Sequence, residues 1–291
     1  MPKLRGILEI LAATIALLCA GGLCSARGRD LDQLREDVWF LSDSLCAGRA
    51  SATAGSFEAS RFIYRRFESL GLKPSITHFK AGEKVCHNVS AEIKGKGSGL
   101  IVVVAYYDGL GTLGGTLRPG ADANASGVAA LLALADSLRS KTPASSILFA
   151  ALDAHNASNA GAVELYRKLK GRRIKAAVGL EILGSGLAPV RDYHPRYAII
   201  LGGRPYKTLF ETFKSPLVLS YDYYESKDFT ELFHRKVSDV RPFLEAGIPS
   251  LVFTSGITYN TNQPTDTYDT LDYSLLADRI GLVLRWIKSQ L

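Results

Sequence analysis

The stretch that decides the fold begins with GLIVVVAYYD at residues 99–108 and continues through the glycine-rich loop PGADANASG at 119–127. That loop runs directly into GVAALLALADSL at 127–138, which reads as a helix. The first segment is apolar almost throughout, as a strand covered on both faces of a sheet must be. A second apolar strand, ILFAALDA at 147–154, ends in HNASNAGA. The order strand, loop, helix, strand predicts an α/β domain.

The same alternation continues outward from this stretch. Gly71 ends a helix that places its apolar residues near one face. We expect a single three-layer α/β/α domain over residues 27–291, since the chain has no internal repeat and no long linker. Ligands of such sheets gather beyond the carboxyl ends of the central strands. The predicted helices are 30–41, 56–70, 126–138, 160–169 and 275–287, and the predicted strands are 86–93, 100–105, 147–152, 176–183, 197–201 and 247–253.

The N-terminus differs from the rest of the chain. Lys3 and Arg5 precede an apolar run at 7–18, and small residues follow up to Ala26. This pattern is typical of a secretory signal peptide, so we predict that residues 1–26 are removed and that the protein is secreted or periplasmic. The run is shorter than the roughly 20 residues of a membrane span, and Glu9 interrupts it. No stable membrane anchor is therefore expected after cleavage.

Composition and charge limit the partners. The chain has 291 residues, 47% of them hydrophobic, with 35 Lys and Arg against 28 Asp and Glu. The resulting net charge of +7 is spread along the chain, without a basic stripe or a nucleic-acid-binding motif. We therefore expect no nucleic-acid partner.

Two of the four cysteines, Cys46 and Cys86, remain after removal of the signal peptide. In an oxidising compartment they could form one disulfide, which would close a loop of about 40 residues and contribute ~3–4 kcal/mol. The alternative is a pair of buried free thiols. Export favours the disulfide, although spacing alone does not establish it.

Several motifs, in this order and spacing, resemble the zinc aminopeptidases of metallopeptidase family twenty-eight, which also includes the glutaminyl cyclases. The resemblance covers most of the mature chain. It implies a zinc-exopeptidase-like (phosphorylase/hydrolase-like) fold with a mixed central sheet and a cleft at the strand ends. The motifs are LSDSLCAGR at 41–49, HNV at 87–89, GADANASG at 120–127, SD at 238–239, AGIPSLVF at 246–253 and PTDT at 264–267.

The resemblance also implies what should occupy the cleft, and the first two positions depart from it. The family strand ends in His-x-Asp, where the His binds metal and the Asp supports it; here the triplet begins with Tyr106 and ends with Asp108. A phenol with a pKa near 10 is a poor zinc ligand at neutral pH. The bridging Asp of the family aligns with Asp122. In the family a cis peptide bond and a second acidic residue follow it, whereas Ala123 follows here.

The remaining positions depart further. Where the family has two adjacent glutamates, a general base and a ligand, this chain has His155 and Asn156. Glu181 matches a ligand that is usually Asp, and Asn262 stands in place of the last His. The five ligand positions thus offer two carboxylates and no imidazole, which leaves the charge of about +4 of a zinc pair poorly compensated. The residues predict no resident metal and no catalytic group.

These substitutions favour a peptidase homologue with a degenerate metal site. Two carboxylates without a metal favour a cationic group, so the expected ligand is a peptide terminus or a small amine. The alternative is a divergent aminopeptidase that holds one zinc through Asp122, Glu181 and either His155 or Asp239. A third possibility is a purely structural or assembly role. The residues expected to form the ligand-binding cleft are Tyr106, Asp108, Asp122, His155, Asn156, Glu181 and Asn262.

The segment at 190–225 is unusually rich in tyrosine. Such side chains suit the rim of a cleft that contacts a peptide or sugar, while partial burial is the ordinary alternative. The tyrosines are Tyr193, Tyr197, Tyr206, Tyr221, Tyr223 and Tyr224.

Overall fold

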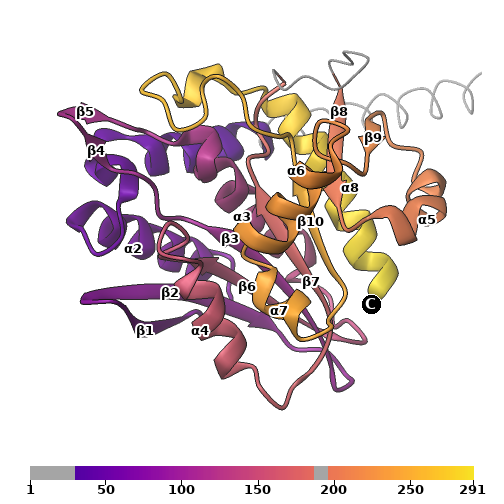
Figure 1. Ribbon diagram of the computed structural model, residues 1–291. Coiled ribbons are helices and arrows are strands. Elements are labelled where there is room, and N and C mark those ends of the chain that lie inside the picture. Colours follow the sequence, from indigo (N-terminus) through magenta and orange to yellow (C-terminus); the bar gives the residue numbers. More distant parts are fainter. Residues whose placement is uncertain (1–29, 187–195) are drawn as a thin grey trace, which may run out of the picture.

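A mixed eight-stranded sheet lies at the centre of the computed structural model, which describes residues 30–186 and 196–291 (Figure 1). The predicted signal peptide and Tyr193 lie outside these residues. The strand order is β1-β2-β6-β3-β7-β10-β8-β9. The predicted three-layer fold with a mixed sheet is therefore confirmed. The strands are β1 Ser75–Ala81, β2 Lys84–Ile93, β3 Gly99–Tyr106, β6 Ser146–Leu152, β7 Arg173–Glu181, β8 Tyr197–Leu201, β9 Val218–Ser220 and β10 Ser250–Thr254, with a separate hairpin of β4 Thr112–Leu113 and β5 Thr116–Leu117.

Strand direction brings the site together. β3 runs parallel to β6 and β7, and β10 runs parallel to β7. The carboxyl ends of these four strands therefore meet at one edge of the sheet, as ligand sites in open α/β sheets require. The flanking β2 and β8 run antiparallel to their inner neighbours, which makes the sheet mixed.

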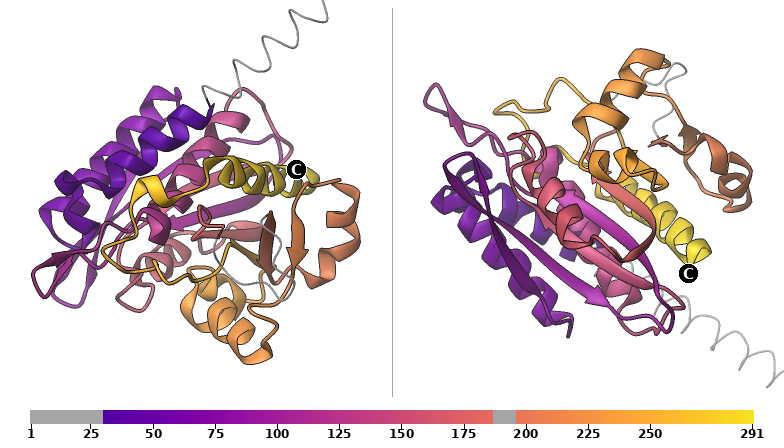
Figure 2. Two further views of the ribbon diagram at one scale, coloured as in Figure 1. Left: turned by 90° about the horizontal axis from the view of Figure 1, so that it is seen from above. Right: turned by 60° about the horizontal axis from the view of Figure 1, so that its bottom comes forward.

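Helices cover both faces of the sheet (Figure 2). Every residue of β3 is buried, and successive side chains enter different cores: Ile101 and Val103 pack in one, Leu100 and Val102 in the other. A helix at 30–42, α2, α3 and α8 contribute to the first core, and α4 and α7 to the second. The helices are α2 Ala54–Ser69, α3 Ser126–Leu138, α4 Ala160–Lys168, α5 Lys207–Thr212, α6 Lys227–Leu232, α7 Arg241–Glu245 and α8 Tyr273–Gln290, and the short helical turns are η1 Ser44–Arg49, η2 Ala121–Ala125, η3 Arg204–Tyr206, η4 Phe233–Val237 and η5 Tyr268–Thr270.

Arg49, in the 41–49 motif, joins the loops around the cleft through hydrogen bonds. Its side chain is fully buried and donates to the backbone oxygens of Tyr107 at 2.8 Å, Pro119 at 2.9 Å and Gly120 at 2.8 Å, and also to that of Leu41. One guanidinium thus joins the end of β3 to the glycine-rich loop. A buried cation is tolerated here because several carbonyl oxygens accept from it.

The expected disulfide is not present, because Cys46 and Cys86 are both buried free thiols. Cys46 lies in η1 against Gly55 of α2, whereas Cys86 lies on β2 beside the carboxyl of Asp153. Burial raises the pKa of each thiol to about 11, which keeps both protonated. Among the described residues, no helix is both long and apolar enough to cross a membrane.

Candidate functional site

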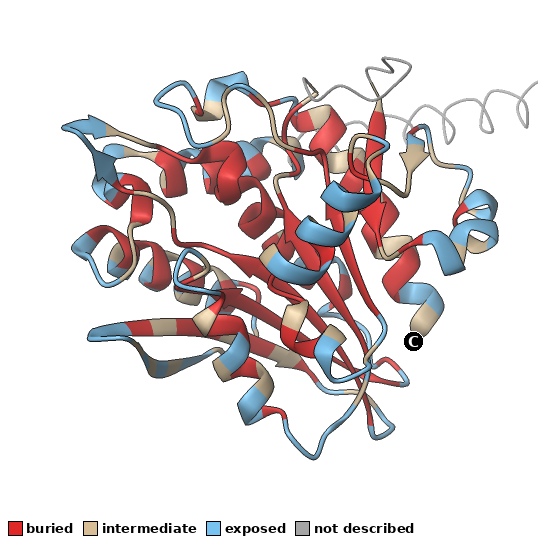
Figure 3. Cartoon of the chain, viewed as in Figure 1, coloured by how far each residue is buried: buried red, intermediate tan, exposed pale blue. Residues whose placement is uncertain are grey.

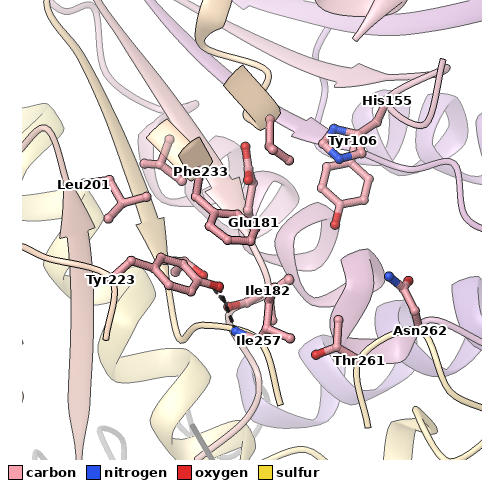
Figure 4. A pocket seen from close by; sticks show the side chains of 13 residues that line it. Tyr106, His155, Glu181, Ile182, Leu201, Tyr223, Phe233, Ile257, Thr261 and Asn262 are labelled. Atoms are coloured by element: carbon pink, nitrogen blue, oxygen red, sulfur yellow. Dashed lines mark hydrogen bonds between the residues drawn. The ribbon is translucent and has the colours of Figure 1, made fainter. Parts of the chain in front are cut away.

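A pocket of about 110 Å³ opens at the carboxyl ends of the parallel strands (Figure 4). Tyr106 ends β3, Glu181 ends β7, and His155 lies in the turn after β6. Together with Asn262, these residues line the pocket, so tertiary structure gathers four of the seven predicted positions. Asp108, Asp122 and Asn156 are not part of the lining. The other lining residues are Ile182, Leu201, Tyr223, Phe233, Val237, Val252, Thr254, Ile257 and Thr261.

His155 is held by a carboxylate and by a stacked ring. Its Nδ1 lies 3.0 Å from Oδ2 of Asp239, and its ring stacks on that of Tyr106 with centroids 3.8 Å apart and planes 12° apart. Burial acts to lower the pKa of His155, but the charge of Asp239 and its hydrogen bond outweigh burial and raise the pKa to about 9. At neutral pH the pocket therefore contains an imidazolium ion.

Asp239 is the residue that connects the others. Its Oδ1 accepts from Asn159 Nδ2 at 3.1 Å, while its backbone N–H donates to Oε1 of Glu181 at 3.2 Å. Burial, and then the nearby charge of Asp239, raise the pKa of Glu181 to about 7. His155, Asp239 and Glu181 thus form one coupled group. The SD motif of the sequence pointed to Asp239, but only the fold shows that it faces His155.

The Tyr106 hydroxyl points toward Thr261 and Asn262 in Figure 4. Burial and then the negative charges of Glu181 and Asp239 raise its pKa well above its ordinary value. Because the phenol stays protonated, it can donate or accept a hydrogen bond.

Asp108 holds the turn after β6 through hydrogen bonds and does not line the pocket. Its Oδ1 accepts from the backbone N of His155 at 2.8 Å, and its Oδ2 accepts from Nδ2 of Asn156 at 3.1 Å and from Oγ of Ser51 at 3.2 Å. Asp108 therefore fixes the backbone that presents His155. Asn156 contacts Asp108 instead of the pocket.

Asp122 also lies apart from the pocket lining. Its Oδ1 accepts from the backbone N of Gly184 at 2.6 Å and from Oγ of Ser126 at 3.0 Å, while its Oδ2 is buried without a hydrogen-bond partner. The cis peptide bond that the resemblance places after Asp122 follows Ala123 instead.

Asn262 lies in the loop before the PTDT motif, and its backbone oxygen accepts from Arg118 Nη1 at 3.3 Å. It is exposed, it lines the pocket, and it lies beside Thr261, below the Tyr106 hydroxyl in the view of Figure 4.

The donors around the pocket do not fit zinc. A structural or catalytic zinc ion needs three or four convergent donors. Nδ1 of His155 is paired with Asp239, and Oε1 of Glu181 accepts a backbone N–H. These contacts leave Nε2 and Oε2, and two donors are fewer than zinc needs. Across residues 30–186 and 196–291, no three His, Cys, Asp or Glu side chains are placed to hold a metal ion together. Asp122 in particular does not join Glu181 and His155.

Most of the apolar residues that line the pocket were not predicted from the sequence. Leu201, Val252 and Ile257 come from β8, β10 and the loop after β10, and Phe233 comes from η4. Of the tyrosine-rich segment, Tyr223 lines the pocket but is only 2% exposed, so it is a buried wall residue and not part of a rim. Tyr197 is also buried, and its hydroxyl donates to the backbone oxygen of Ser255 at 2.8 Å.

The three-layer fold with a cleft at the strand ends defines a zinc-exopeptidase-like protein. The sequence model of Peptidase family M28 matches residues 88–287, well over half of the chain, and the chain therefore belongs to this family. No curated protein matches it by sequence.

Solved structures agree on the fold. BSAP, a zinc aminopeptidase from Bacillus subtilis, matches with a TM-score of 0.73 and 13% identity over 89% of this chain and 95% of that chain. LapB from Legionella pneumophila matches with a TM-score of 0.69 and 20% identity over 88% and 73% of the two chains. The glutaminyl cyclase of Porphyromonas gingivalis matches with a TM-score of 0.68 and 15% identity over 90% and 98%. At these identities the likeness concerns the fold alone.

Proposed function

We propose that this chain is an exported peptidase homologue that does not perform metal-assisted hydrolysis and instead binds a peptide terminus, or another small ligand with an amine, in its cleft. One observation carries the proposal. Where the family resemblance expects metal ligands, the pocket presents Tyr106 and Asn262, and the imidazole of His155 is already engaged by Asp239.

The charge arrangement explains how the cleft persists without a metal. In a metallopeptidase the cation compensates the carboxylates at the strand ends. Here the imidazolium of His155 lies against Asp239 and supplies a positive charge from within the protein. Among the described residues that line the pocket, Glu181 is the one carboxylate. A cationic α-amine is the group that would pair with it.

The apolar wall of the pocket sets a second requirement for the ligand. Leu201 and Ile257 lie on the side of the pocket away from His155 (Figure 4), and Val252 also lines the pocket. An aliphatic group placed against this wall leaves water, which favours binding by ~25 cal/mol per Å² of apolar area. The ligand that fits best is therefore an amine attached to an apolar side chain, as at the N-terminus of a peptide.

Export is proposed from residues 1–26 alone, because they lie outside the described residues. Their basic flank and short apolar run fit a cleaved leader. Expression of the full chain, followed by fractionation and mass determination, tests this. A mature protein in the periplasm or medium that lacks about 26 residues is the expected result, and an uncleaved cytoplasmic chain would count against it.

The binding test uses two matched ligands. Leucinamide offers a free amine and an apolar side chain, and N-acetyl-leucinamide keeps the side chain but carries an uncharged acetamide in place of the amine. Isothermal titration is expected to detect binding of leucinamide alone, and Glu181→Gln is expected to weaken it. Equal binding of both ligands, or of neither, would contradict the proposal.

Metal analysis separates the proposal from the alternative, a one-metal aminopeptidase. Protein purified without chelator is expected to contain well below one zinc per chain and to release no chromophore from leucine p-nitroanilide. Stoichiometric zinc together with turnover that a chelator abolishes would instead establish the enzyme.

A further inference from the structure

The aromatic wall of the pocket continues onto the molecular surface. Phe233 lines the pocket, and its ring stacks on that of Tyr223 with centroids 4.5 Å apart. Phe233 also lies parallel to Phe229 of α6, with centroids 6.2 Å apart and planes 13° apart. Phe229 is 48% exposed. A row of rings therefore leads from the interior of the pocket to solvent.

Helical spacing extends this row on the outer surface. Leu232 is three residues after Phe229, and Phe233 is four residues after it, so the three side chains share one side of the helical segment. Leu232 is 45% exposed, and Figure 3 shows α6 as a largely exposed helix. Phe229 and Leu232 together are called the outer apolar surface below.

Hydrogen bonds fix the outer apolar surface relative to the pocket. Ser226 caps α6, with its Oγ accepting from Phe229 N at 3.3 Å. Thr230 Oγ1 accepts from the backbone N of Tyr223 at 2.7 Å, which joins α6 to the residue that lines the pocket. The surface is thus held in one position, and a ligand does not have to order it.

Pocket size makes a second contact necessary for any longer ligand. The volume of about 110 Å³ is well below the roughly 300–1,000 Å³ of pockets that enclose whole drug-sized ligands. The pocket therefore has room for about one side chain. A peptide bound by its N-terminal residue must leave across the rim, and the outer apolar surface adjoins the aromatic wall of the pocket.

We propose that the site selects peptides whose first two residues are both apolar: the pocket takes the first side chain, and the outer apolar surface takes the second. This inference rests on the proposed function, because it extends the same N-terminal binding mode by one residue. Isolated exposed apolar side chains are ordinary. Phe229 differs because its ring stacks on that of Phe233, which lines the pocket, and Leu232 shares its side of the helical segment.

The test compares leucinamide, leucyl-glycinamide and leucyl-phenylalaninamide by isothermal titration. The phenylalanine ligand is expected to bind roughly five- to tenfold more tightly than the glycine ligand, because its ring covers apolar surface. The double variant Phe229→Ser, Leu232→Ser is expected to remove this difference and to leave leucinamide binding unchanged. Phe57→Ser is the matched control, since Phe57 is exposed to a similar extent, 47%, and lies on α2.

The outcomes separate the two proposals. If leucinamide binds but the two dipeptide ligands bind equally, or if the double variant keeps their difference, the outer apolar surface plays no part and the inference fails. If none of the three ligands binds, the proposed function fails and the inference fails with it. Thermal melts of each variant test whether it is folded. Because both substituted side chains are exposed, we expect each variant to stay folded.

Discussion

His155 sets the charge of the cleft. Its imidazole lies between the ring of Tyr106 and the carboxylate of Asp239, and the pKa of about 9 follows from that carboxylate. The sequence placed a histidine where the family has its general base, but it gave no partner for it. The partner comes from a segment more than 80 residues later in the chain.

Asp239→Asn is expected to lower the pKa of His155 by at least about one unit, since the amide cannot compensate an imidazolium. An NMR titration of the imidazole resonances measures this. Asp32→Asn, at an exposed position, is the control and should leave the titration unchanged. A His155 pKa that is the same in Asp239→Asn and in the native protein would contradict the assigned contact.

Thermal stability is expected to fall as pH rises from about 5 to 9.5. The pKa values of Glu181 and Asp266 are raised on folding, from 4.5 and 3.8 respectively to about 7, and that of His155 from 6.5 to about 9. The folded state thus holds these protons more tightly, and the stability that they contribute is lost as pH passes first 7 and then 9. Calorimetry across this range measures the fall. His155→Gln should flatten its upper part, whereas a stability that rises toward pH 9 would refute the assignment.

The glycine-rich loop acts as an element that ties strands together. Asn124 donates from Nδ2 to the backbone oxygens of Tyr106 at 3.1 Å and Leu180 at 3.0 Å, and its Oδ1 accepts from Ile182 N at 2.8 Å. Gly127 leaves room for this side chain, because a Cβ there would lie 2.4 Å from Oδ1 of Asn124. The ends of β3 and β7 are therefore held at a fixed separation.

Asn124→Ala is expected to destabilise the protein by about 2–4 kcal/mol, because it removes three hydrogen bonds, two of which are buried. Urea denaturation measures the change. Gln263→Ala is the control, since this amide side chain is exposed and its loss should alter stability by less than about 0.5 kcal/mol. Similar losses for both variants would show that the three hydrogen bonds contribute little.

Element prediction succeeded where apolar runs were long. The segments at 100–105, 126–138 and 147–152 lie within β3, α3 and β6. The half-exposed edge strand β1 and the short α6 escaped prediction, because neither has a sustained apolar period. α6 nevertheless matters, since it carries the outer apolar surface.

The molecule as a whole is held together without a covalent crosslink between Cys46 and Cys86. Its thermal midpoint is therefore expected to be the same with and without a reducing agent, and both thiols should react with Ellman's reagent only after denaturation, because they are buried. Thiol counting in the native and denatured states measures this. A midpoint that falls on reduction, with no free thiols before it, would indicate that the two cysteines pair after all.

The sequence by itself determined the α/β class, the central strands and the absence of metal-binding side chains at most family positions, because apolar periodicity and residue type are local properties. Only the tertiary structure decided which side chains share the pocket. It left Asp122 out of the pocket that Glu181 lines, brought Asp239 to His155 and placed Phe229 beside the aromatic wall. The physical reason is that hydrogen bonds and packing between segments far apart in the chain set side-chain direction, and a linear pattern does not encode them.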